Sequence, residues 1–277
     1  MEDKVPGQTA AALSSTVRQQ PMSASRPSEH LNAAEFTASV DDVFGRIASR
    51  YDLLCDLFSF WIHRHWKRRV AMLVASQPWQ DLLDSASGTG DIVLRVLNRQ
   101  PGNATRRIVA SDISPQMLAI AKRRLAPLAQ SVELRQLDAH SMPSVPAASV
   151  DLYSISLGLK ICNRHAVLRE ALRVLKPGGR LIVLEASNIP VRWLHQAYLL
   201  YMSVCMPFIG WVATGGDASA YRYLLQGIRE FPTAEALAEE IRQVGFDNVS
   251  FERLSLGIVA IHVAQKPADG ARAQSRA

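Results

Sequence analysis

One segment constrains this chain more than any other: residues Asp84 to Asp91 read D-S-A-S-G-T-G-D. It follows a short apolar run and precedes apolar residues at helical spacing, so it lies where a strand turns into a helix. In open α/β sheets, ligands bind at the carboxyl ends of strands, where backbone amides are unpaired. Gly88 and Gly90 permit close backbone approach, Thr89 adds a hydroxyl, and Asp91 can cap the helix. The segment predicts a ligand site, with a plain strand–helix connection as the alternative.

A second signal lies at the end of the next predicted strand, I-V-A-S-D, which closes on Asp112. This acid follows the glycines by about 20 residues, the spacing at which a carboxylate reaches a ribose hydroxyl. The pattern G-x-G-x-x-G is absent, and no Lys of a P-loop follows the turn. The two signals together predict a nucleoside cofactor with little or no phosphate, for which S-adenosylmethionine is the candidate.

Several motifs carry a family resemblance. S-D-I-S-P-Q-M-L-A-I-A from Ser111 and R-V-L-K-P-G-G-R-L from Arg173 resemble class I S-adenosylmethionine-dependent methyltransferases. V-F-G-R-I-A-S-R-Y-D-L-L-C-D-L-F-S-F-W-I-H-R-H-W-K-R from Val43 and Y-R-Y-L from Tyr221 resemble the UbiE/COQ5 group, which C-methylates the ring of ubiquinone and menaquinone precursors. The likeness extends from about Val43 to Ala264.

The pattern of strands and helices predicts the fold class. Five strands are expected near Asp81–Asp84, Arg107–Asp112, Val132–Asp138, Val150–Ser156 and Arg180–Glu185. Helices are expected at Ile92–Leu97, Pro115–Leu125, His165–Leu175 and Thr233–Val244, with a turn at Pro177–Gly179 and a hairpin formed by Val249–Leu254 and Gly257–Val263. We therefore expect an α/β, Rossmann-like, doubly wound, mostly parallel seven-stranded sheet with an antiparallel C-terminal hairpin and a helical N-terminal cap.

Composition sets the domain boundaries. Residues 1–38 are poor in large apolar side chains, so we expect a disordered tail, one methyltransferase domain over 39–267, and a flexible C-terminus over 268–277. The tail has no apolar core for a secretory signal, and its Ser/Arg-rich stretch resembles a transit peptide only faintly. A cytoplasmic location is expected, with attachment to the inner membrane or mitochondrial targeting as alternatives.

Charge and cysteine usage exclude some classes of protein. The formal net charge is +6, but Lys and Arg are scattered apart from one cluster, Arg64 and Lys67 to Arg69. We interpret that cluster as a solvated helix face rather than a nucleic-acid or membrane patch, so no nucleic-acid partner is expected. The three cysteines lack metal-ligand spacing and are odd in number, which favours a reduced compartment and predicts neither a disulfide framework nor a metal site.

The segment before the first strand, Asp41 to Val74, has apolar residues at helical spacing. Trp66 is expected to pack in the core. Tyr51 either closes over the cofactor or packs in the core as well. His63 and His65 alternate with basic residues and are expected at the surface or in a lid, since no partner at metal-ligand spacing is nearby.

The methyltransferase resemblance assigns roles to residues at the strand ends. Asp138 would contact the adenine amino group, although it could instead cap a helix. Ser156 would place a hydroxyl against the cofactor, and Glu185 would point into the acceptor crevice or lie in a solvated turn. The complete set of expected cofactor-binding residues is Tyr51, Asp84, Gly88, Thr89, Gly90, Asp112, Ile113, Asp138, Ala139 and Ser156.

The most apolar run is Ala197 to Val212, which is short for a membrane span and contains Pro207. It is either a buried helix or an apolar lid over the acceptor. A lid would suit an acceptor with a prenyl tail, since Met202 and Met206 offer adaptable apolar contacts.

Methyl transfer to carbon needs a ring held about 3–3.5 Å from the methyl group and a group that stabilises the phenolate. The UbiE/COQ5 group has F-G-x-R-N after strand four, whereas this chain reads L-G-L-K-I-C-N, with Lys160 in place of the arginine. The loop before Y-R-Y-L also differs from the family, reading G-G-D-A-S-A. We expect Lys160 to act as phenolate stabiliser or as base, and Tyr221 and Arg222 to orient the ring.

Three functions remain open at this point. The first is C-methylation of a prenylated benzoquinol or naphthoquinol ring in quinone biosynthesis. The second is methylation of another aromatic or polyketide-like acceptor, which the altered acceptor motifs favour. The third is a non-catalytic S-adenosylmethionine-binding subunit of a biosynthetic complex. The expected partner is a small aromatic acceptor with or without an apolar tail, and membrane attachment, a biosynthetic complex and a homodimer all stay open.

Overall fold

The structure is a computed structural model, and it describes residues 51–99, 106–214 and 219–268. The predicted tail over 1–38, the start of the predicted leader helices and residues 269–277 lie outside the described residues.

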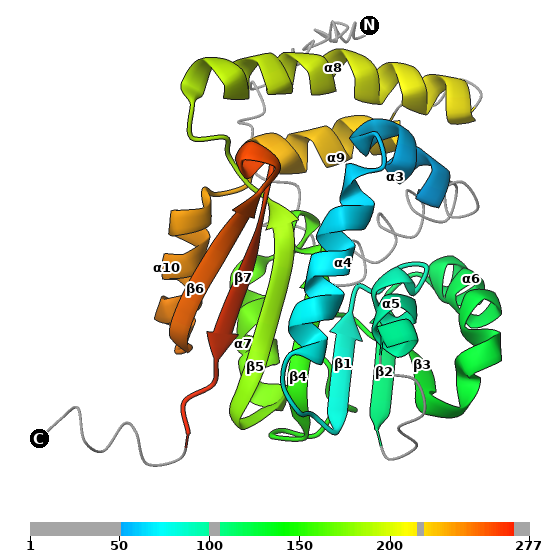
Figure 1. Cartoon of the computed structure of the whole chain (residues 1–277), viewed down its shortest axis with the longest axis vertical. Coiled ribbons are helices and arrows are strands. Elements are labelled where there is room, and N and C mark those ends of the chain that lie inside the picture. The colour runs from blue at the N-terminus through cyan, green and yellow to red at the C-terminus, as the bar shows by residue number, and fades with distance from the viewer. Residues whose placement is uncertain (1–50, 100–105, 215–218, 269–277) are drawn as a thin grey trace, which may run out of the picture.

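A seven-stranded sheet with the order β3-β2-β1-β4-β5-β7-β6 forms the centre of the molecule (Figure 1). Strands β1 to β5 pair in parallel, whereas β7 is antiparallel to both β5 and β6. This confirms the predicted parallel sheet with an antiparallel C-terminal hairpin at its edge. The strands are β1 (Asp81–Ser85), β2 (Arg107–Asp112), β3 (Val132–Gln136), β4 (Val150–Ser156), β5 (Leu175–Ala186), β6 (Asp247–Leu254) and β7 (Val259–Gln265).

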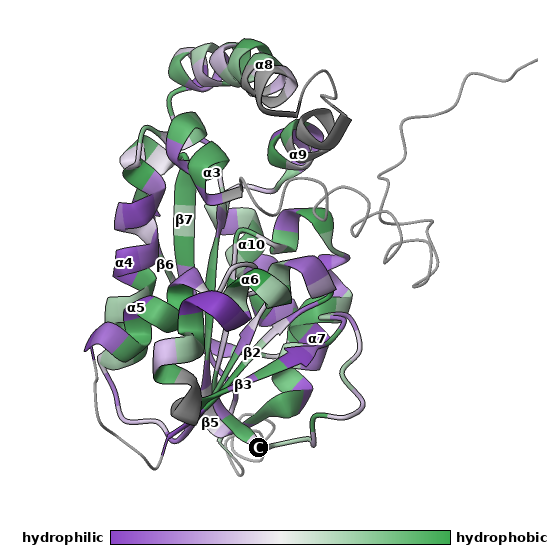
Figure 2. Cartoon of the chain, turned by 90° about the vertical axis from the view of Figure 1, so that its right-hand side faces the viewer, coloured by the Kyte–Doolittle hydropathy of each residue, from purple (hydrophilic) through white to green (hydrophobic). Residues whose placement is uncertain are grey.

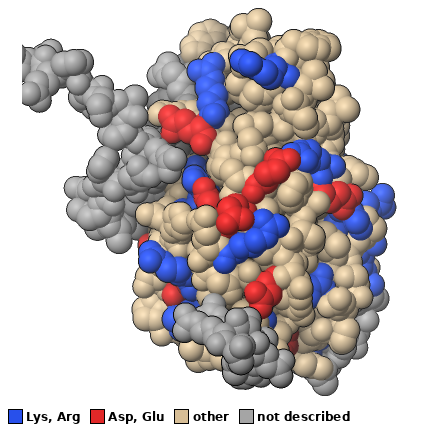
Figure 3. Space-filling view, turned by 90° about the vertical axis from the view of Figure 1, so that its left-hand side faces the viewer, with Lys and Arg blue, Asp and Glu red and all other residues tan. Residues whose placement is uncertain are grey.

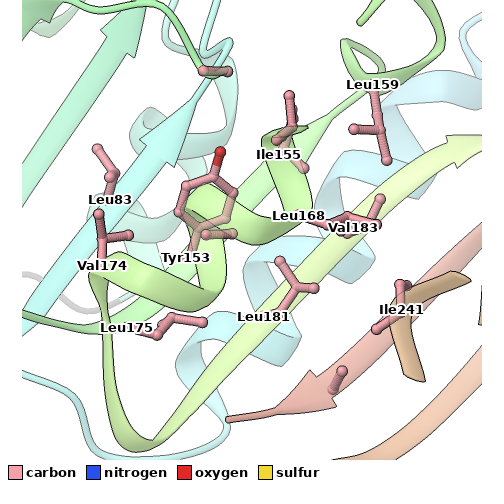
Figure 4. Close-up of a cluster of buried hydrophobic side chains, with 14 of the residues drawn as sticks. Leu83, Tyr153, Ile155, Leu159, Leu168, Val174, Leu175, Leu181, Val183 and Ile241 are labelled. Carbon is pink, nitrogen blue, oxygen red and sulfur yellow. The ribbon is translucent and has the colours of Figure 1, made fainter. Parts of the chain in front are cut away.

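Helices cover both faces of the sheet, as the doubly wound prediction requires (Figure 2). The described helices are α3 (Tyr51–Ser59), α4 (Ile62–Ala75), α5 (Asp91–Arg99), α6 (Pro115–Leu125), α7 (Arg164–Val174), α8 (Arg192–Thr214), α9 (Ser219–Glu230) and α10 (Ala234–Val244). Helices α7 and α10 pack on one face around Tyr153 and Leu181 (Figure 4), and α4, α5 and α6 pack on the other around Leu152 and Ile182. Side chains that alternate along β4 and β5 therefore enter two different cores.

Local sequence signals set several helix ends. Ser114 caps α6 by accepting a hydrogen bond from the Met117 N–H, and Pro115 occupies the first turn, where its missing N–H costs nothing. Thr233 caps α10 in the same way, and Gly245 ends that helix with a φ of 114°. These caps explain why the predicted bounds of both helices are close to the observed ones.

Helices α3, α8 and α9 lie beyond the carboxyl ends of the parallel strands (Figure 1). Helix α8 contains the predicted apolar run, and Pro207 lies within it without ending the helix. The expectation that this helix is buried is wrong for one of its faces, because large apolar side chains are 56–73% exposed there. They recur at helical spacing: Trp193, Leu200, Val204, Phe208 and Trp211. None of the helices in the described ranges is long and apolar enough to cross a membrane.

The predicted turn at Pro177–Gly179 lies inside β5, which begins at Leu175. Gly178 has a φ of 76°, and its N–H bonds to the Lys266 carbonyl at 3.0 Å, so pairing with the C-terminal segment continues the strand through the glycines. That pairing joins residues far apart in the sequence, which explains why a local pattern indicates a turn.

Charged residues of both signs are interspersed on the face over α10 and β6 (Figure 3). The basic cluster on α4 was predicted to be a solvated helix face. This prediction is wrong for Lys67, which is buried. Its Nζ lies 3.1 Å from Asp91 Oδ2 in the first turn of α5. A buried lysine needs such a partner, since an unpaired charge in the interior is costly.

Candidate functional site

The loop after β1 and the acid that ends β2 are tied together. Asp112 Oδ2 accepts a hydrogen bond from the Gly88 N–H at 2.8 Å, and its Oδ1 accepts one from the Ser114 N–H at 2.9 Å. The register of β1 and β2 brings them together, because Ser85 lies opposite Ser111. One carboxylate thus holds the glycine loop in place while facing the space beyond the sheet edge.

A cavity of about 80 Å³ opens at this edge. It contains six of the ten predicted cofactor-binding residues: Gly88, Asp112, Ile113, Asp138, Ala139 and Ser156. The wall also contains residues that were not predicted: Ala86, Met117, Leu137, Leu157, Gly158, Ile161 and Cys162. The motif L-G-L-K-I-C could have revealed the last four, because it follows β4 at the same sheet edge as the glycine loop.

The residues in this wall fit an adenosyl group. Ser156 Oγ is buried and has no hydrogen-bond partner in the described part of the chain, so a ligand hydroxyl or amine would satisfy it. Ile113, Met117 and Leu137 provide apolar surfaces for a flat base.

Asp138 lies in this wall, with its carboxylate already engaged by a neighbour. Its Oδ1 accepts the backbone N–H of His140 at 2.9 Å and lies 2.6 Å from His140 Nδ1. Partial burial disfavours the carboxylate, but the bonds to His140 outweigh it and the pKa of Asp138 is lowered. No helix begins here: the chain turns back in a bridge between Asp138 and Ser141, so the alternative role as a helix cap is wrong.

Three predicted cofactor residues, Asp84, Thr89 and Gly90, do not line the cavity. Thr89 Oγ1 donates to Asp52 Oδ1 at 3.0 Å and accepts from Arg124 Nη1 at 2.6 Å, so its hydroxyl joins α3 and α6 to the loop. Gly90 has a φ of 76°, and an added Cβ would lie 3.0 Å from Leu125 Cδ1. The positive φ, together with the close approach of Leu125, therefore favours glycine at this position.

Asp84 is buried at the end of β1, where the Ser154 hydroxyl donates to its Oδ1 at 2.6 Å. Its Oδ2 is buried without a hydrogen-bond partner among the described residues. Burial raises the pKa of Asp84 to about 7, because desolvation disfavours the charged form more than the bond from Ser154 favours it.

The side chains of Tyr51, Tyr221 and Arg222 lie outside the described residues. The roles expected for them, closing over the cofactor and orienting the ring, remain predictions.

A second, larger cavity of about 540 Å³ lies between α3, α4, α8 and the end of β5. Its wall is mainly apolar and includes Leu54, Phe58, Trp66, Ile189, Leu194, Tyr198, Tyr201, Met202, Ile228, Leu256, Ile258 and Val259. Trp66 is buried as predicted, and its Nε1 donates to Ser255 Oγ at 2.8 Å. This cavity has no local signal in the sequence, because its walls come from segments that lie far apart in the chain.

An ion pair interrupts the apolar wall. Lys160 Nζ lies 3.4 Å from Glu185 Oε1 and also donates to the Leu157 carbonyl. Glu185 is fully buried, and its carboxylate accepts the N–H groups of Lys160 at 3.0 Å and Ala186 at 2.7 Å. The alternative that Glu185 lies in a solvated turn is wrong. The pair is instead a buried charge-assisted cluster at the floor of the cavity.

His63 also lines the larger cavity and is only 5% exposed. The expectation that it lies at the surface is therefore wrong, whereas His65 on the same helix is exposed. Burial and the nearby Lys67 lower the pKa of His63 to about 4, so the imidazole is neutral at pH 7. No group of three or more His, Cys, Asp or Glu side chains in the described ranges could hold a metal ion.

The two cavities meet at Leu157, which lies in the wall of both. This leucine has a φ of 60°, a conformation that is uncommon for a residue with a branched side chain. Its N–H bonds to the Leu184 carbonyl at 2.8 Å, which helps to hold it there. The two cavities are therefore neighbours at this residue.

The same fold occurs in solved methyltransferases. A SAM-dependent methyltransferase from Thermotoga maritima aligns with a TM-score of 0.55 and 17% identity over 81% of this chain and 99% of that chain. At this identity the likeness concerns the fold alone. Fold and sequence family together place the chain among the S-adenosylmethionine-dependent methyltransferases.

The family follows from the sequence. The model of the ubiE/COQ5 methyltransferase family matches residues 31–266, so the chain belongs to that family and the predicted resemblance is confirmed. A relative from Paracoccus denitrificans, named ubiquinone/menaquinone biosynthesis C-methyltransferase UbiE, is 40% identical over 230 residues, covering 82% of this chain and 90% of the relative. A relative of the same name from Cereibacter sphaeroides is 40% identical over 235 residues, covering 84% and 92%.

Proposed function

We propose that this enzyme transfers a methyl group from S-adenosylmethionine to a ring carbon of a quinol in quinone biosynthesis. The observation that carries the proposal is the large apolar cavity, which meets the cofactor cavity at Leu157 and contains one buried ion pair. A quinol matches this environment because it combines an apolar ring with a small number of hydroxyl groups. The names of the Paracoccus and Cereibacter relatives support the same acceptor class.

The cofactor would bind in the smaller cavity, with Asp112 on the ribose and Ser156 and Asp138 on the base. When bound, it supplies a methyl group on a positively charged sulfur that is ready for displacement. The protein's contribution is therefore to hold the ring carbon in line with that methyl and to exclude water.

Lys160 is proposed as the group that stabilises the acceptor oxygen as its charge develops. Its ammonium is held by the Leu157 carbonyl and by Glu185, at the position where the two cavities meet. A preorganised charge in an apolar cavity stabilises an oxyanion more strongly than a solvated one. The contact of the ammonium with a carboxylate supports the role of stabiliser over that of base.

The test uses purified enzyme, methyl-labelled cofactor and demethylated quinols with short and long prenyl tails. Labelled quinol carrying the new methyl on carbon is the expected product. The Lys160→Met variant should lose turnover by about 10²-fold or more while its cofactor affinity is unchanged, and Lys122→Met, on the exposed face of α6, should match the wild type. Full turnover in Lys160→Met would remove Lys160 from the mechanism.

A second acceptor class is favoured by Lys160 itself, which stands where the family has an arginine. A compact ammonium does not make the planar two-point contact of a guanidinium, so the bound acceptor can differ. If wild-type enzyme ignores every quinol but methylates other phenols, the acceptor is another aromatic or polyketide-like compound. If it binds the cofactor and methylates no acceptor, the non-catalytic alternative gains support.

We further propose that α8 lies against a membrane surface from which a prenylated acceptor enters. One face of α8 lines the larger cavity through Tyr198 and Met202, and the opposite face exposes Trp193 and Trp211. Tryptophan suits the boundary between water and lipid.

Replacing both tryptophans of α8 with Ser should abolish sedimentation of the enzyme with lipid vesicles. If light scattering shows dimers that the replacement dissociates, a second copy or another protein covers this face instead.

A further inference from the structure

A buried histidine in the acceptor cavity is not explained by packing alone. His63 lies on α4, next to the same cavity as Lys160 and Glu185. Among the described residues, the structure gives hydrogen-bond partners to its backbone N–H and its Nδ1, and none to its Nε2. An imidazole nitrogen beside an apolar cavity can accept a hydrogen bond from a ligand hydroxyl, and Nε2 is not occupied by another described residue.

The hydrogen bonds of Ser59 fix the tautomer of this ring. Ser59 Oγ has one hydrogen, and it donates this hydrogen to the Cys55 carbonyl at 2.6 Å, because a carbonyl can only accept. Towards His63 Nδ1, at 2.8 Å, the same oxygen must therefore accept. It also accepts the backbone N–H of His63 at 3.3 Å, which uses its second lone pair. Nδ1 consequently carries the hydrogen, and Nε2 has a free lone pair.

Burial is the main cause that keeps the ring of His63 neutral, because desolvation disfavours the charged imidazolium, and the surrounding charges act in both directions. Lys67 and Arg64 oppose its protonation, whereas Asp56, 3.8 Å from Nδ1, and Asp91 favour it. Asp56 is already paired with the guanidinium of Arg64 at 2.7 Å, and Asp91 is paired with Lys67 at 3.1 Å. With burial as the largest effect, the pKa of the imidazole falls to about 4, and Nε2 is available as an acceptor at pH 7.

We propose that His63 is a catalytic residue whose Nε2 accepts the hydroxyl proton of the acceptor ring during methyl transfer. This inference rests on the proposed function, because it requires a phenolic acceptor in the larger cavity. A weak base suffices for the task. The hydroxyl of a free phenol is only slightly acidic. Its proton becomes strongly acidic while the ring carbon bonds to the methyl group, because the ring gains positive charge.

The atoms and electrons balance as follows. The ring carbon bonds to the methyl carbon, the sulfur–methyl bond breaks, and its electron pair stays on sulfur. At the same time the hydroxyl proton moves to Nε2, leaving a ring ketone next to the Lys160 ammonium and an imidazolium on His63. The methylated carbon then loses its hydrogen to water as a proton, and the imidazolium returns its proton to the oxygen. The aromatic ring is restored, and one proton is released for each methyl transferred.

The experiment compares His63→Asn with His65→Asn on the full-length chain. The amide introduced by His63→Asn can still donate to Ser59 but places no group at the position of Nε2, whereas His65 is an exposed histidine on the same helix. We expect His63→Asn to lower kcat by about 10²-fold or more, with the cofactor Kd and the melting temperature unchanged. His65→Asn should match the wild type. In His63→Ala, added imidazole should restore part of the lost kcat, which a purely structural role would not allow.

Ser59→Ala tests the tautomer. Without the hydroxyl the proton is free to occupy Nε2, so we expect a loss of kcat that is smaller than that of His63→Asn and not additive with it. Wild-type kcat in His63→Asn, or a loss in His63→Ala that imidazole does not restore, would overturn the role of His63. A wild-type enzyme that methylates no phenolic acceptor would instead overturn the proposed function, so the two failures are distinguishable.

Discussion

Replacing Asp84 with Asn should make the enzyme more stable at alkaline pH relative to the wild type. The side chain is buried, its Oδ2 has no hydrogen-bond partner among the described residues, and burial raises its pKa to about 7 from an ordinary 3.8. In an unfolded chain the same carboxyl ionises near its ordinary pKa. Between these two values the folded state binds more protons than the unfolded state, so stability falls as the pH rises.

The magnitude follows from the two pKa values. Their difference corresponds to about 4 kcal/mol in full, since each pKa unit is worth about 1.36 kcal/mol. About 2–3 kcal/mol of this falls between pH 5 and pH 8, because part of the loss has already occurred at pH 5. The amide introduced by Asp84→Asn does not titrate, so the free energy of unfolding of the variant lacks this contribution. Any constant cost of burying the amide cancels when the pH dependence is compared.

The assay is urea unfolding of both proteins at pH 5, 6, 7 and 8, monitored by tryptophan fluorescence. We expect the stability of Asp84→Asn minus that of the wild type to rise by about 2–3 kcal/mol over this range. Titrating groups that do not interact with Asp84 are common to both proteins and cancel in the difference. A difference that is flat across the four pH values would refute the reasoning, because it would mean that Asp84 is ionised in the folded protein throughout.

Three further predictions concern the cofactor loop and its support. Asp112→Ala should weaken cofactor binding by about 10-fold or more with the fold intact; unchanged affinity in calorimetry would exclude the ribose contact. Gly90→Ala should lower the free energy of unfolding by about 1–3 kcal/mol, because the new Cβ meets Leu125 at 3.0 Å with a φ of 76°, and wild-type stability in urea would contradict this. Lys67→Met should cost about 1–3 kcal/mol by removing the nearest cation from the buried Asp91, and a more stable variant in the same assay would show that the pair is unfavourable.

Much of the fold could be predicted from the sequence because each parallel strand and its helix carry local signals. Alternation of strands and helices predicts the sheet, and Ser114 and Thr233 mark the starts of α6 and α10. The prediction of a turn at Pro177–Gly179 is wrong, because pairing with a segment near Lys266 extends β5 through these residues. No local pattern reveals this pairing.

The cofactor cavity was more predictable than the acceptor cavity for the same reason. Its wall consists of residues that follow the ends of neighbouring strands, so Asp112, Asp138 and Ser156 could be placed from strand ends alone. Thr89 was expected to face the cofactor, but its hydroxyl bonds to Arg124 on α6, a partner that only the packed structure provides.

The acceptor cavity depends on helices that pack far from their sequence neighbours. His63 alternates with basic residues, which resembles an exposed face, yet it is buried on α4, where α3 packs against this helix. The role that we propose for it depends on the hydrogen bonds of Ser59, which are not visible in the sequence.

The bonds that join Asp52, Thr89 and Arg124 have a consequence for how strongly the binding of one substrate affects the binding of the other. Asp52 belongs to α3, whose Leu54 and Phe58 form part of the acceptor cavity, and Thr89 belongs to the loop that faces the cofactor. An acceptor that steadies α3 therefore also steadies the cofactor loop, and linkage requires the effect to be reciprocal. The enzyme should bind either substrate more tightly when the other is present, and the Arg124→Met enzyme should bind the two independently.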